Sequence, residues 1–451
     1  MSSYNLVLLA CSGVTLVMFL YSNYYASAPS IVEGEMETSK LHFESFRNKY
    51  LGVYLLMVAG DWLQGPYVYS LYSKYGFSHS EIALLFVVGF GASMVMGTFV
   101  GSLADSRGRK KFCLLYAVLY IASCCTKHVD NFYALLLGRL LGGIATSLLC
   151  STFESWLVCE CNAKQYGESK LAEVFAWQTL GNSLIAIGSG VLGQIASDAY
   201  PMIQIVSGVY MGGYTLPFDL ASLAMVLGSI LCIVTWEENY GERQVETFPL
   251  AALRQGLQVL QENPSVLVCG LVQSLFEGAM FSFVFEWSPA LTNPDNQNEL
   301  VPYGTIFATF MVCCMAGSLL VKPALNQMGK PQDVLPWVFF TSAIGLSAVP
   351  IQVYLARNDL AMYGFLMFEM MVGMYYPLMG MLKSQIVPEQ HRTTLYNLFR
   401  IPLNAIVLVV LLGKFTVSQT FSICIGLLLL AAIGIRFVGS MKQETGQRRD
   451  S

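Results

Sequence analysis

The chain has 451 residues, of which 55% are hydrophobic and 12% are charged. A soluble domain carries about 25% charged residues, so this composition excludes an ordinary water-soluble protein and indicates one that lies in a lipid bilayer. The formal net charge of −4 gives no reason to expect nucleic acid as a partner. The 12 cysteines lie almost entirely within apolar runs, so we expect no disulfide framework, no metal site and no cofactor.

Residues 1–22 contain the first apolar run, and they predict an uncleaved transmembrane anchor helix whose N-terminus lies outside. The alternative is a cleaved signal peptide, which would leave Lys40, Arg47 and Lys49 outside and reverse the first helix of the core. Residues 23–49 are polar and rich in glutamate, which predicts a cytoplasmic linker.

Twelve further apolar segments are each long enough to span a bilayer as a helix, which takes about 20 residues. We predict these spans at residues 50–72, 80–104, 111–126, 130–158, 170–198, 214–236, 264–290, 301–321, 333–355, 358–382, 393–413 and 416–440.

The spans form an N-terminal six-helix half, residues 50–236, and a C-terminal six-helix half, residues 264–440. The cytoplasmic linker 237–263 joins them, and residues 441–451 form a cytoplasmic tail. Within the linker, the segment from Pro249 has helical periodicity and predicts an amphipathic helix on the membrane surface. On this map most lysines and arginines lie on the cytoplasmic side, as expected for short loops of membrane proteins.

The two halves show a weak internal repeat. The same offset relates Asp61 to Glu277 and Gly101-Ser-Leu to Gly317-Ser-Leu. Repeated six-helix halves with a binding site between them near the bilayer midplane are typical of secondary transporters.

The loop after the second core span concentrates basic residues in the stretch 101–111. We expect this stretch to act as a gating loop that depends on Gly101, Asp105, Gly108 and Arg109. Glycine allows the positive φ of a tight turn, and the basic residues favour the cytoplasmic side.

An ionisable side chain at membrane depth costs several kcal/mol, so it faces the protein interior and serves a function. Asp61 and Glu277, one in each half, are candidates for proton coupling. The alternative is that each is permanently paired with Arg139 or Arg400. Gln178 and Asn182 add a further polar pair on the fifth span, at i and i+4.

The strongest substrate-binding candidate is Arg400, because arginine stays charged when it is desolvated. Asn397 and Asn404 share its helix face at i−3 and i+4 and would donate hydrogen bonds to an anion. The alternative is that Arg400 pairs structurally with an acid.

Arg139 and Gln64 are further substrate-binding candidates, although Arg139 stands among glycines where a role in helix packing is equally expected. Glu154 and Glu369 are weaker candidates for proton coupling. Glu154 lies 15 residues beyond Arg139, about 22 Å along one helix, so the two cannot share a small ligand.

The stretch 101–111 resembles the loop between helices two and three of the major facilitator superfamily, except that Ser106 stands where a basic residue is usual. Longer strings resemble the eukaryotic molybdate-anion transporter family within it, namely Asp61-Trp-Leu-Gln-Gly-Pro-Tyr67, Phe153-Glu-Ser-Trp156, Glu238-Asn-Tyr240, Leu275-Phe-Glu277, Phe283-Val-Phe-Glu-Trp-Ser-Pro289, Tyr376-Pro377, Ile386-Val-Pro-Glu389 and Phe399-Arg-Ile-Pro402. The strings cover about residues 45–440 in order.

We therefore expect an all-α membrane protein with the major facilitator fold, two six-helix halves and an extra N-terminal transmembrane helix. The resemblance implies uptake of molybdate by alternating access in a multi-pass protein of the plasma membrane, and we expect a monomer in the bilayer. The alternatives are a facilitator for sulfate or another anion, and a non-transporting receptor or scaffold on the same fold. No enzyme motif is present in the sequence, so we expect no enzyme activity.

Overall fold

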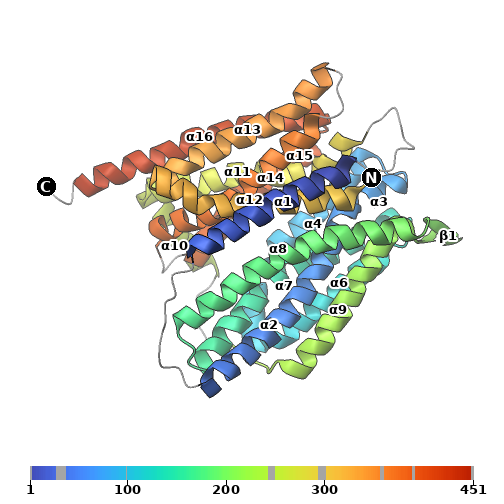
Figure 1. Cartoon of the computed structure of the whole chain (residues 1–451), viewed down its shortest axis with the longest axis horizontal. Helices are drawn as coiled ribbons and strands as arrows, with labels where there is room; N and C mark the ends of the chain where they lie inside the picture. Colours follow the sequence, from blue (N-terminus) through green and yellow to red (C-terminus); the bar gives the residue numbers. More distant parts are fainter. Residues whose placement is uncertain are drawn as a thin grey trace. The chain divides into compact units, whose positions relative to one another are not determined.

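The computed structural model describes residues 3–26, 37–97, 99–241, 249–292, 301–355, 360–388 and 392–447. The chain divides into two compact units. The N unit comprises Tyr25–Gln244 and Pro302–Ala308, and the C unit comprises Met1–Tyr24, Val245–Val301 and Thr309–Ser451. Each is a bundle of long helices (Figure 1).

In the described part of the chain, ten helices are long and apolar enough to cross a membrane. Three more helices, α2 (Glu37–Gln64), α6 (Arg109–Thr126) and α15 (Arg392–Leu412), occupy predicted core spans. Helix α6 begins on three basic residues, and α15 offers only a shorter apolar stretch, Leu398–Leu412. The prediction of twelve core helices preceded by an additional N-terminal helix is confirmed.

The elements of the N unit are α2 (Glu37–Gln64), η1 (Gly65–Tyr67), α3 (Val68–Lys74), α4 (His79–Gly97), α5 (Val100–Arg107), α6 (Arg109–Thr126), α7 (Phe132–Ala163), α8 (Glu168–Ala199), β1 (Ile203–Val206), β2 (Val209–Met211), η2 (Gly213–Thr215) and α9 (Leu216–Thr235). Helix α2 packs on α8 and α9, and α7 packs on α4 and α6 (Figure 1).

Helix α2 begins at Glu37, well before the predicted start of its span at residue 50. Phe43, Phe46 and Tyr50 are only 2%, 8% and 0% exposed, and they lie on one helix face. Phe43 and Phe46 pack on Tyr166, and Phe46 also stacks on Trp156. Residues 37–49 of the predicted linker are therefore the first turns of α2, because an apolar stripe within a polar segment docks on α7 and the loop that follows it.

The first core span is interrupted at Pro66. Helix α2 ends at Gln64, a single 3₁₀ turn follows, and α3 resumes from Val68. Proline has no N–H to donate to the preceding turn, which is why the α-helix breaks at this point.

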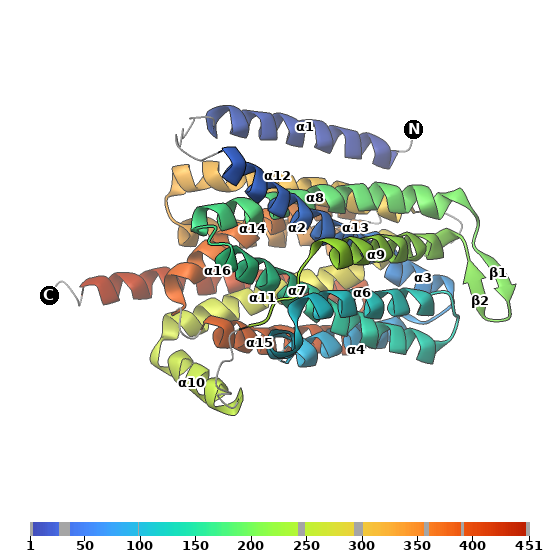
Figure 2. The ribbon, with the colours of Figure 1, turned by 90° about the horizontal axis from the view of Figure 1, so that it is seen from below.

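A short antiparallel hairpin, β1–β2, connects α8 to α9 and extends past their ends (Figure 2). Tyr210 N donates to His128 O, and Asp130 N donates to Gly208 O, both at 2.8 Å. The His128 ring adds contacts of 3.0 Å from Nδ1 to Tyr210 O and of 3.0 Å from Nε2 to Asp219 Oδ1. A carbonyl and a carboxylate can only accept, so both contacts are hydrogen bonds only in the protonated, imidazolium form of His128.

The helices of the C unit are α1 (Ser3–Ala26), α10 (Pro249–Glu262), α11 (Pro264–Leu291), α12 (Tyr303–Met328), α13 (Pro331–Leu355), α14 (Leu360–Ile386), α15 (Arg392–Leu412) and α16 (Val417–Gln447). The first turn of α12 is part of the N unit. Helix α11 packs on α14, α15 and α16, and α13 packs on α14 and α16. The predicted helix of the linker is present as α10, which packs on α11 and α15.

Two glycines allow α12 and α14 to approach each other closely. A Cβ at Gly317 would overlap the carbonyl of Met370, and a Cβ at Gly373 would overlap the carbonyl of Cys314. Gly317 thus lies within α12, just as its counterpart in the internal repeat, Gly101, lies within α5. The turn after α12 is instead made by Gly329, at φ +92°.

We predict that the attachment of the hairpin weakens as the pH rises. The hydrogen bond to Asp219 raises the pKa of His128 above its ordinary value of 6.5. The contribution of the His128–Asp219 pair to the stability of the fold is therefore complete below pH 6.5 and is lost as the pH rises through the pKa of His128 in the folded state. For this partly exposed pair we expect the free energy of unfolding to fall by at most roughly 1 kcal/mol, which lowers the melting temperature by about 2 °C.

The measurement is the melting temperature of the purified protein from pH about 6 to about 9, the range over which such a histidine titrates. Asp219→Asn is the matched variant, because its amide keeps the shape and removes the charge. An equal pH dependence in both proteins would contradict the prediction.

Candidate functional site

In the N unit, one carboxylate lies near mid-length of the first core span, with a tyrosine and an arginine beside it. Asp61 is half-buried and accepts a hydrogen bond from Tyr120 Oη on α6. The Arg139 guanidinium on α7 acts electrostatically on the same carboxylate. A desolvated carboxylate needs a donor and a compensating positive charge, and this site supplies both.

Arg139 is held in position by α4. Its Nε donates to Leu85 O at 3.3 Å, and its guanidinium carbon lies 4.4 Å from the centre of the Phe86 ring. A Cβ at Gly89 would come within 2.9 Å of the guanidinium, so this glycine makes room for the arginine. The terminal guanidinium nitrogens form no hydrogen bond with any residue that the structure describes, which leaves them available to an anion.

Gln178 on α8 connects α2 to α7. Tyr50 Oη donates to Gln178 Oε1 at 2.8 Å, and the Gln178 side chain also hydrogen-bonds Tyr54 and Glu154. One turn along α8, Asn182 Oδ1 accepts from Trp62 Nε1 at 3.0 Å. The predicted polar pair of α8 thus faces α2, which is the helix that carries Asp61.

Gln64 and Glu154 are not drawn into the cluster around Asp61. The half-buried side chain of Gln64 makes no hydrogen bond to any of the residues with described side chains. Glu154 is exposed, and its contact is with Gln178. The structure therefore brings together Asp61 and Arg139 among the predicted residues of this unit, and leaves Glu154 apart from them.

The C unit holds a second carboxylate with a tyrosine donor. Glu277 on α11 accepts from Tyr375 Oη at 3.0 Å and also hydrogen-bonds the Gln273 side chain. Lys383 on α14 and Arg400 on α15 act on it electrostatically. Glu277 and Asp61 thus have the same kind of environment, a tyrosine hydroxyl and nearby basic side chains.

Arg400 is exposed on α15, and it acts on Glu277 without being part of a buried ion pair. Asn404, one turn further along, is half-buried. Asn397 belongs to the same helix, but its side chain lies outside the described part of the structure. An exposed guanidinium near a carboxylate can exchange that carboxylate for a bound anion.

Glu369 lies elsewhere in the C unit. It is buried on α14, and its charge acts on the thiols of Cys313 and Cys314 on α12. It forms no hydrogen bond with any residue that the structure describes, and it is not joined to Glu277.

The stretch 101–111 binds the segment that follows α9. Gly101 and Asp105 lie within α5, and Gly108 alone makes the turn, at φ +112°. Arg109 Nε donates to Asp105 Oδ1 at 2.7 Å. Glu238 accepts from the backbone N–H groups of Lys110 at 2.8 Å and Lys111 at 3.2 Å, so it caps the N-terminus of α6.

Sequence analysis did not identify Tyr120, Tyr375, Lys383 or Glu238 as contributors to these sites. The signals were weak. Tyr120 follows Tyr116 at i+4 on an apolar helix, and Glu238 stands in an acidic stretch directly after a span. Such residues acquire a role only when a second helix brings a partner to them.

Comparison with known proteins gives consistent matches over most of the chain. A family model described as sugar transporters with twelve transmembrane helices matches residues 13–372. A molybdate-anion transporter of Xenopus tropicalis is 34% identical over 423 residues, which cover 90% of this chain and 88% of that protein. Another from Danio rerio is 29% identical over 436 residues, 87% of each protein.

Solved structures share the fold at low identity. A D-xylose–proton symporter has a TM-score of 0.65 at 13% identity, covering 88% of this chain and 97% of that chain. A peptide transporter in complex with sulfate has a TM-score of 0.65 at 13% identity, covering 89% and 95%. At this identity the likeness concerns the fold alone.

We predict that Tyr120→Phe destabilises the protein by about 1–3 kcal/mol, because Asp61 loses its hydroxyl donor in a poorly solvated site. The measurement is the melting temperature of the purified protein. Tyr116→Phe is the matched control on the same helix: it removes a hydroxyl that donates to Met57 O at 3.1 Å and to no carboxylate. An equal loss in both variants would contradict a specific dependence of Asp61 on Tyr120.

Proposed function

Since this chain belongs to the molybdate-anion transporter family of the major facilitator superfamily, we propose that it carries the molybdate dianion across a membrane. The observation that carries the proposal is the 34% identity to a molybdate-anion transporter over nearly the whole of both chains. The multi-pass architecture and the basic side chains at membrane depth are consistent with it. The family consists of transporters, so the chain is not expected to act as an enzyme.

Molybdate is a tetrahedral dianion of nearly the same shape as sulfate, and in a poorly solvated site it needs positive charge and several N–H or O–H donors. Arg400 supplies an exposed guanidinium, and Asn404 lies one turn away on the same helix face. Lys383, which also acts on Glu277, adds a second cation. In the N unit, the terminal guanidinium nitrogens of Arg139 and the amide of Gln64 form no hydrogen bond with any residue whose side chain the structure describes.

The two carboxylates suggest how transport is coupled to protons. Glu277 and the bound anion would compete for the same cations, Lys383 and Arg400. When the anion takes up their positive charge, a proton neutralises Glu277, so anion and proton are taken up together. Asp61 and Arg139 provide the same pair in the N unit. The cycle would be alternating access, as expected for repeated six-helix halves.

The proposed location is the plasma membrane, where uptake of a scarce trace anion from outside takes place, and the proposed active form is a monomer. Sulfate or another anion is the alternative substrate, and a receptor or scaffold without transport is the alternative function. The free guanidinium nitrogens of Arg139 and the exposed Arg400 favour an anion carrier over a scaffold, which has no need of such groups.

We predict that cells expressing the protein take up molybdate at nanomolar concentration in the presence of a large excess of sulfate. Arg400→Ala should weaken the apparent affinity roughly 10- to 100-fold, the effect of losing a charge-assisted hydrogen bond. The control is Arg254→Ala, which removes an exposed guanidinium from α10. Membrane levels of the three proteins are matched.

Each outcome of this uptake experiment has a separate meaning. Uptake by the wild type and the control but not by Arg400→Ala supports both substrate and site. Equal uptake by all three removes Arg400 from the site and retains the substrate. If none of the three proteins takes up molybdate although each is at the cell surface, molybdate transport is contradicted. If the excess of sulfate suppresses molybdate uptake, sulfate is the preferred substrate.

We further predict that Asp61→Asn and Glu277→Gln reduce the rate of uptake and abolish its dependence on pH, because an amide cannot carry the coupled proton. The measurement is initial uptake at several external pH values. A normal rate with unchanged pH dependence in both variants would exclude these carboxylates from proton coupling.

A further inference from the structure

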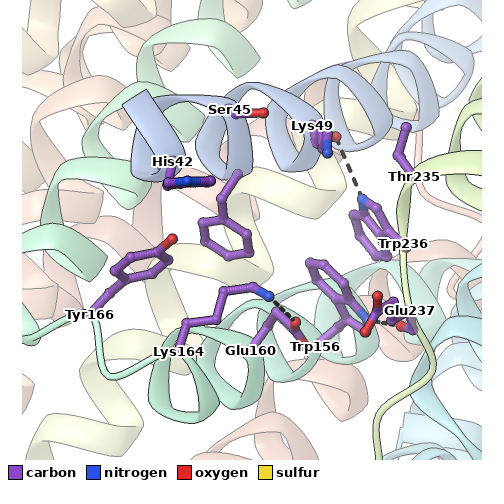
Figure 3. A pocket seen from close by; sticks show the side chains of 11 residues that line it. His42, Ser45, Lys49, Trp156, Glu160, Lys164, Tyr166, Thr235, Trp236 and Glu237 are labelled. Atoms are coloured by element: carbon purple, nitrogen blue, oxygen red, sulfur yellow. Dashed lines mark hydrogen bonds and ion pairs between the residues drawn. The ribbon is translucent and has the colours of Figure 1, made fainter. Parts of the chain in front are cut away.

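A polar pocket lies at one end of the helices of the N unit. Its cavity of about 210 Å³ has room for about seven water molecules at roughly 30 Å³ each. His42, Ser45 and Lys49 come from the first turns of α2, Glu160 and Lys164 from the end of α7, and Trp236 and Glu237 from the segment after α9. Figure 3 shows His42 and Tyr166 at one end of the pocket and Lys49, Trp236 and Glu237 at the other.

The pocket has a rigid aromatic wall. The rings of Trp156 and Trp236 stack with their centroids 3.8 Å apart, and Tyr50 stacks on both. Both indole N–H groups donate to backbone carbonyls, that of Trp156 to Glu237 O at 2.9 Å and that of Trp236 to Lys49 O at 3.5 Å (Figure 3). The wall is thereby formed by the same three segments that carry the charged side chains.

Some charges of the pocket are already compensated within it. Lys164 Nζ forms an ion pair with Glu160 Oε1 at 3.0 Å, and Asn239 Nδ2 donates to Glu160 Oε2 at 3.3 Å. This pair raises the pKa of Lys164, which stays protonated and keeps further N–H donors. The side chains of Lys49, His42 and Glu237 form no ion pair or hydrogen bond with residues that the structure describes, so the pocket offers two basic groups and one acid to a ligand.

The place of the pocket on the helices indicates the source of that ligand. Two candidate membrane spans, Phe132–Ala163 and Gly213–Thr235, both end at the pocket. The loops and the linker at this end of the helices are rich in basic residues, which predicts that the pocket lies on the cytoplasmic side of the membrane. On α9, the residues before Thr235 are apolar and exposed: Ile230 by 54%, Ile233 by 57% and Val234 by 76%. A headgroup in the pocket would therefore have an apolar helix face beside it for its acyl chains.

We propose that this pocket binds the headgroup of a phospholipid of the serine type, from the cytoplasmic leaflet. Such a headgroup carries a phosphate, a carboxylate and an ammonium group. Lys49, Lys164 and the imidazole of His42, which can donate a hydrogen bond, match the two anionic groups, and Glu237 matches the ammonium group. Basic pockets at the cytoplasmic ends of transmembrane helices are known to bind lipid headgroups. The proposal is independent of the transported substrate.

The test measures the melting temperature of the purified full-length protein in detergent as defined lipids are added. We expect phosphatidylserine to raise it, because a ligand that binds the folded state stabilises that state. Phosphatidylglycerol, phosphatidylethanolamine and phosphatidylcholine each lack at least one of the charged groups, so they should raise it less at equal concentration. Soluble phosphoserine, without acyl chains, should have little effect.

The variants are Lys49→Gln and Glu237→Gln, and the matched control is Lys40→Gln, an exposed residue of the same helix that does not line the pocket. We expect Lys49→Gln to weaken the apparent affinity for phosphatidylserine about fivefold, the effect of one lysine near a membrane surface. The control should bind as the wild type does. Melting temperatures without lipid report whether each variant folds.

Three results would overturn the proposal: an equal response to phosphatidylserine and phosphatidylglycerol, a response to soluble phosphoserine as large as that to the lipid, or an equal loss of affinity in Lys49→Gln and Lys40→Gln. A response to phosphatidylserine in Glu237→Gln that matches the wild type would overturn the role of the ammonium group. Molybdate uptake is not a readout of this test, so its result does not depend on the transported substrate.

Discussion

The cost of placing an ionised side chain where water is scarce governs this molecule more than any other constraint. It explains why each unit surrounds its carboxylate with a tyrosine hydroxyl and basic side chains, Tyr120 and Arg139 for Asp61, and Tyr375, Lys383 and Arg400 for Glu277. A carboxylate with such partners can stay ionised at membrane depth. If a bound anion can replace the carboxylate at the basic side chain, the same group can also take part in transport. The same interaction therefore serves stability and, in the proposed cycle, coupling.

Close helix packing makes these sites possible. Gly89 leaves space for the Arg139 guanidinium against α4, and Gly317 and Gly373 let α12 and α14 meet at their backbones. Between α5 and α6, Gly108 turns the chain so that the first N–H groups of α6 meet the carboxylate of Glu238, which follows α9. In each case the absence of a side chain leaves room for a neighbouring group, which a larger residue would displace.

The first turns of α2 connect the transport core with the lipid boundary. Phe43, Phe46 and Tyr50 dock this segment on α7 and the loop after it, and the neighbouring side chains His42, Ser45 and Lys49 line the polar pocket together with Phe46. Further along the same helix lies Asp61. A headgroup bound at one end of α2 would thus touch the helix that carries Asp61, without contacting the Asp61 carboxylate itself.

The sequence by itself determined the membrane location, the number of core helices, most helix ends to within a few residues and the identities of Asp61, Glu277, Arg139 and Arg400 as charged residues at membrane depth. These features depend on local composition and on the costs of burying charge, which are visible along the chain. The first turns of α2 were missed because an apolar stripe within a polar segment is a weak signal.

Only the tertiary structure decided which groups compensate each charge. Tyr120 lies 59 residues from Asp61, and Tyr375 lies 98 residues from Glu277. Helical periodicity specifies the face of one helix on which a residue lies, but not which face of another helix meets it. For the same reason the sequence ranked Glu154 and Glu369 below Asp61 and Glu277 but could not show that they lie apart from those two carboxylates. The pocket built from α2, α7 and the segment after α9 likewise has no signature in any one of these segments.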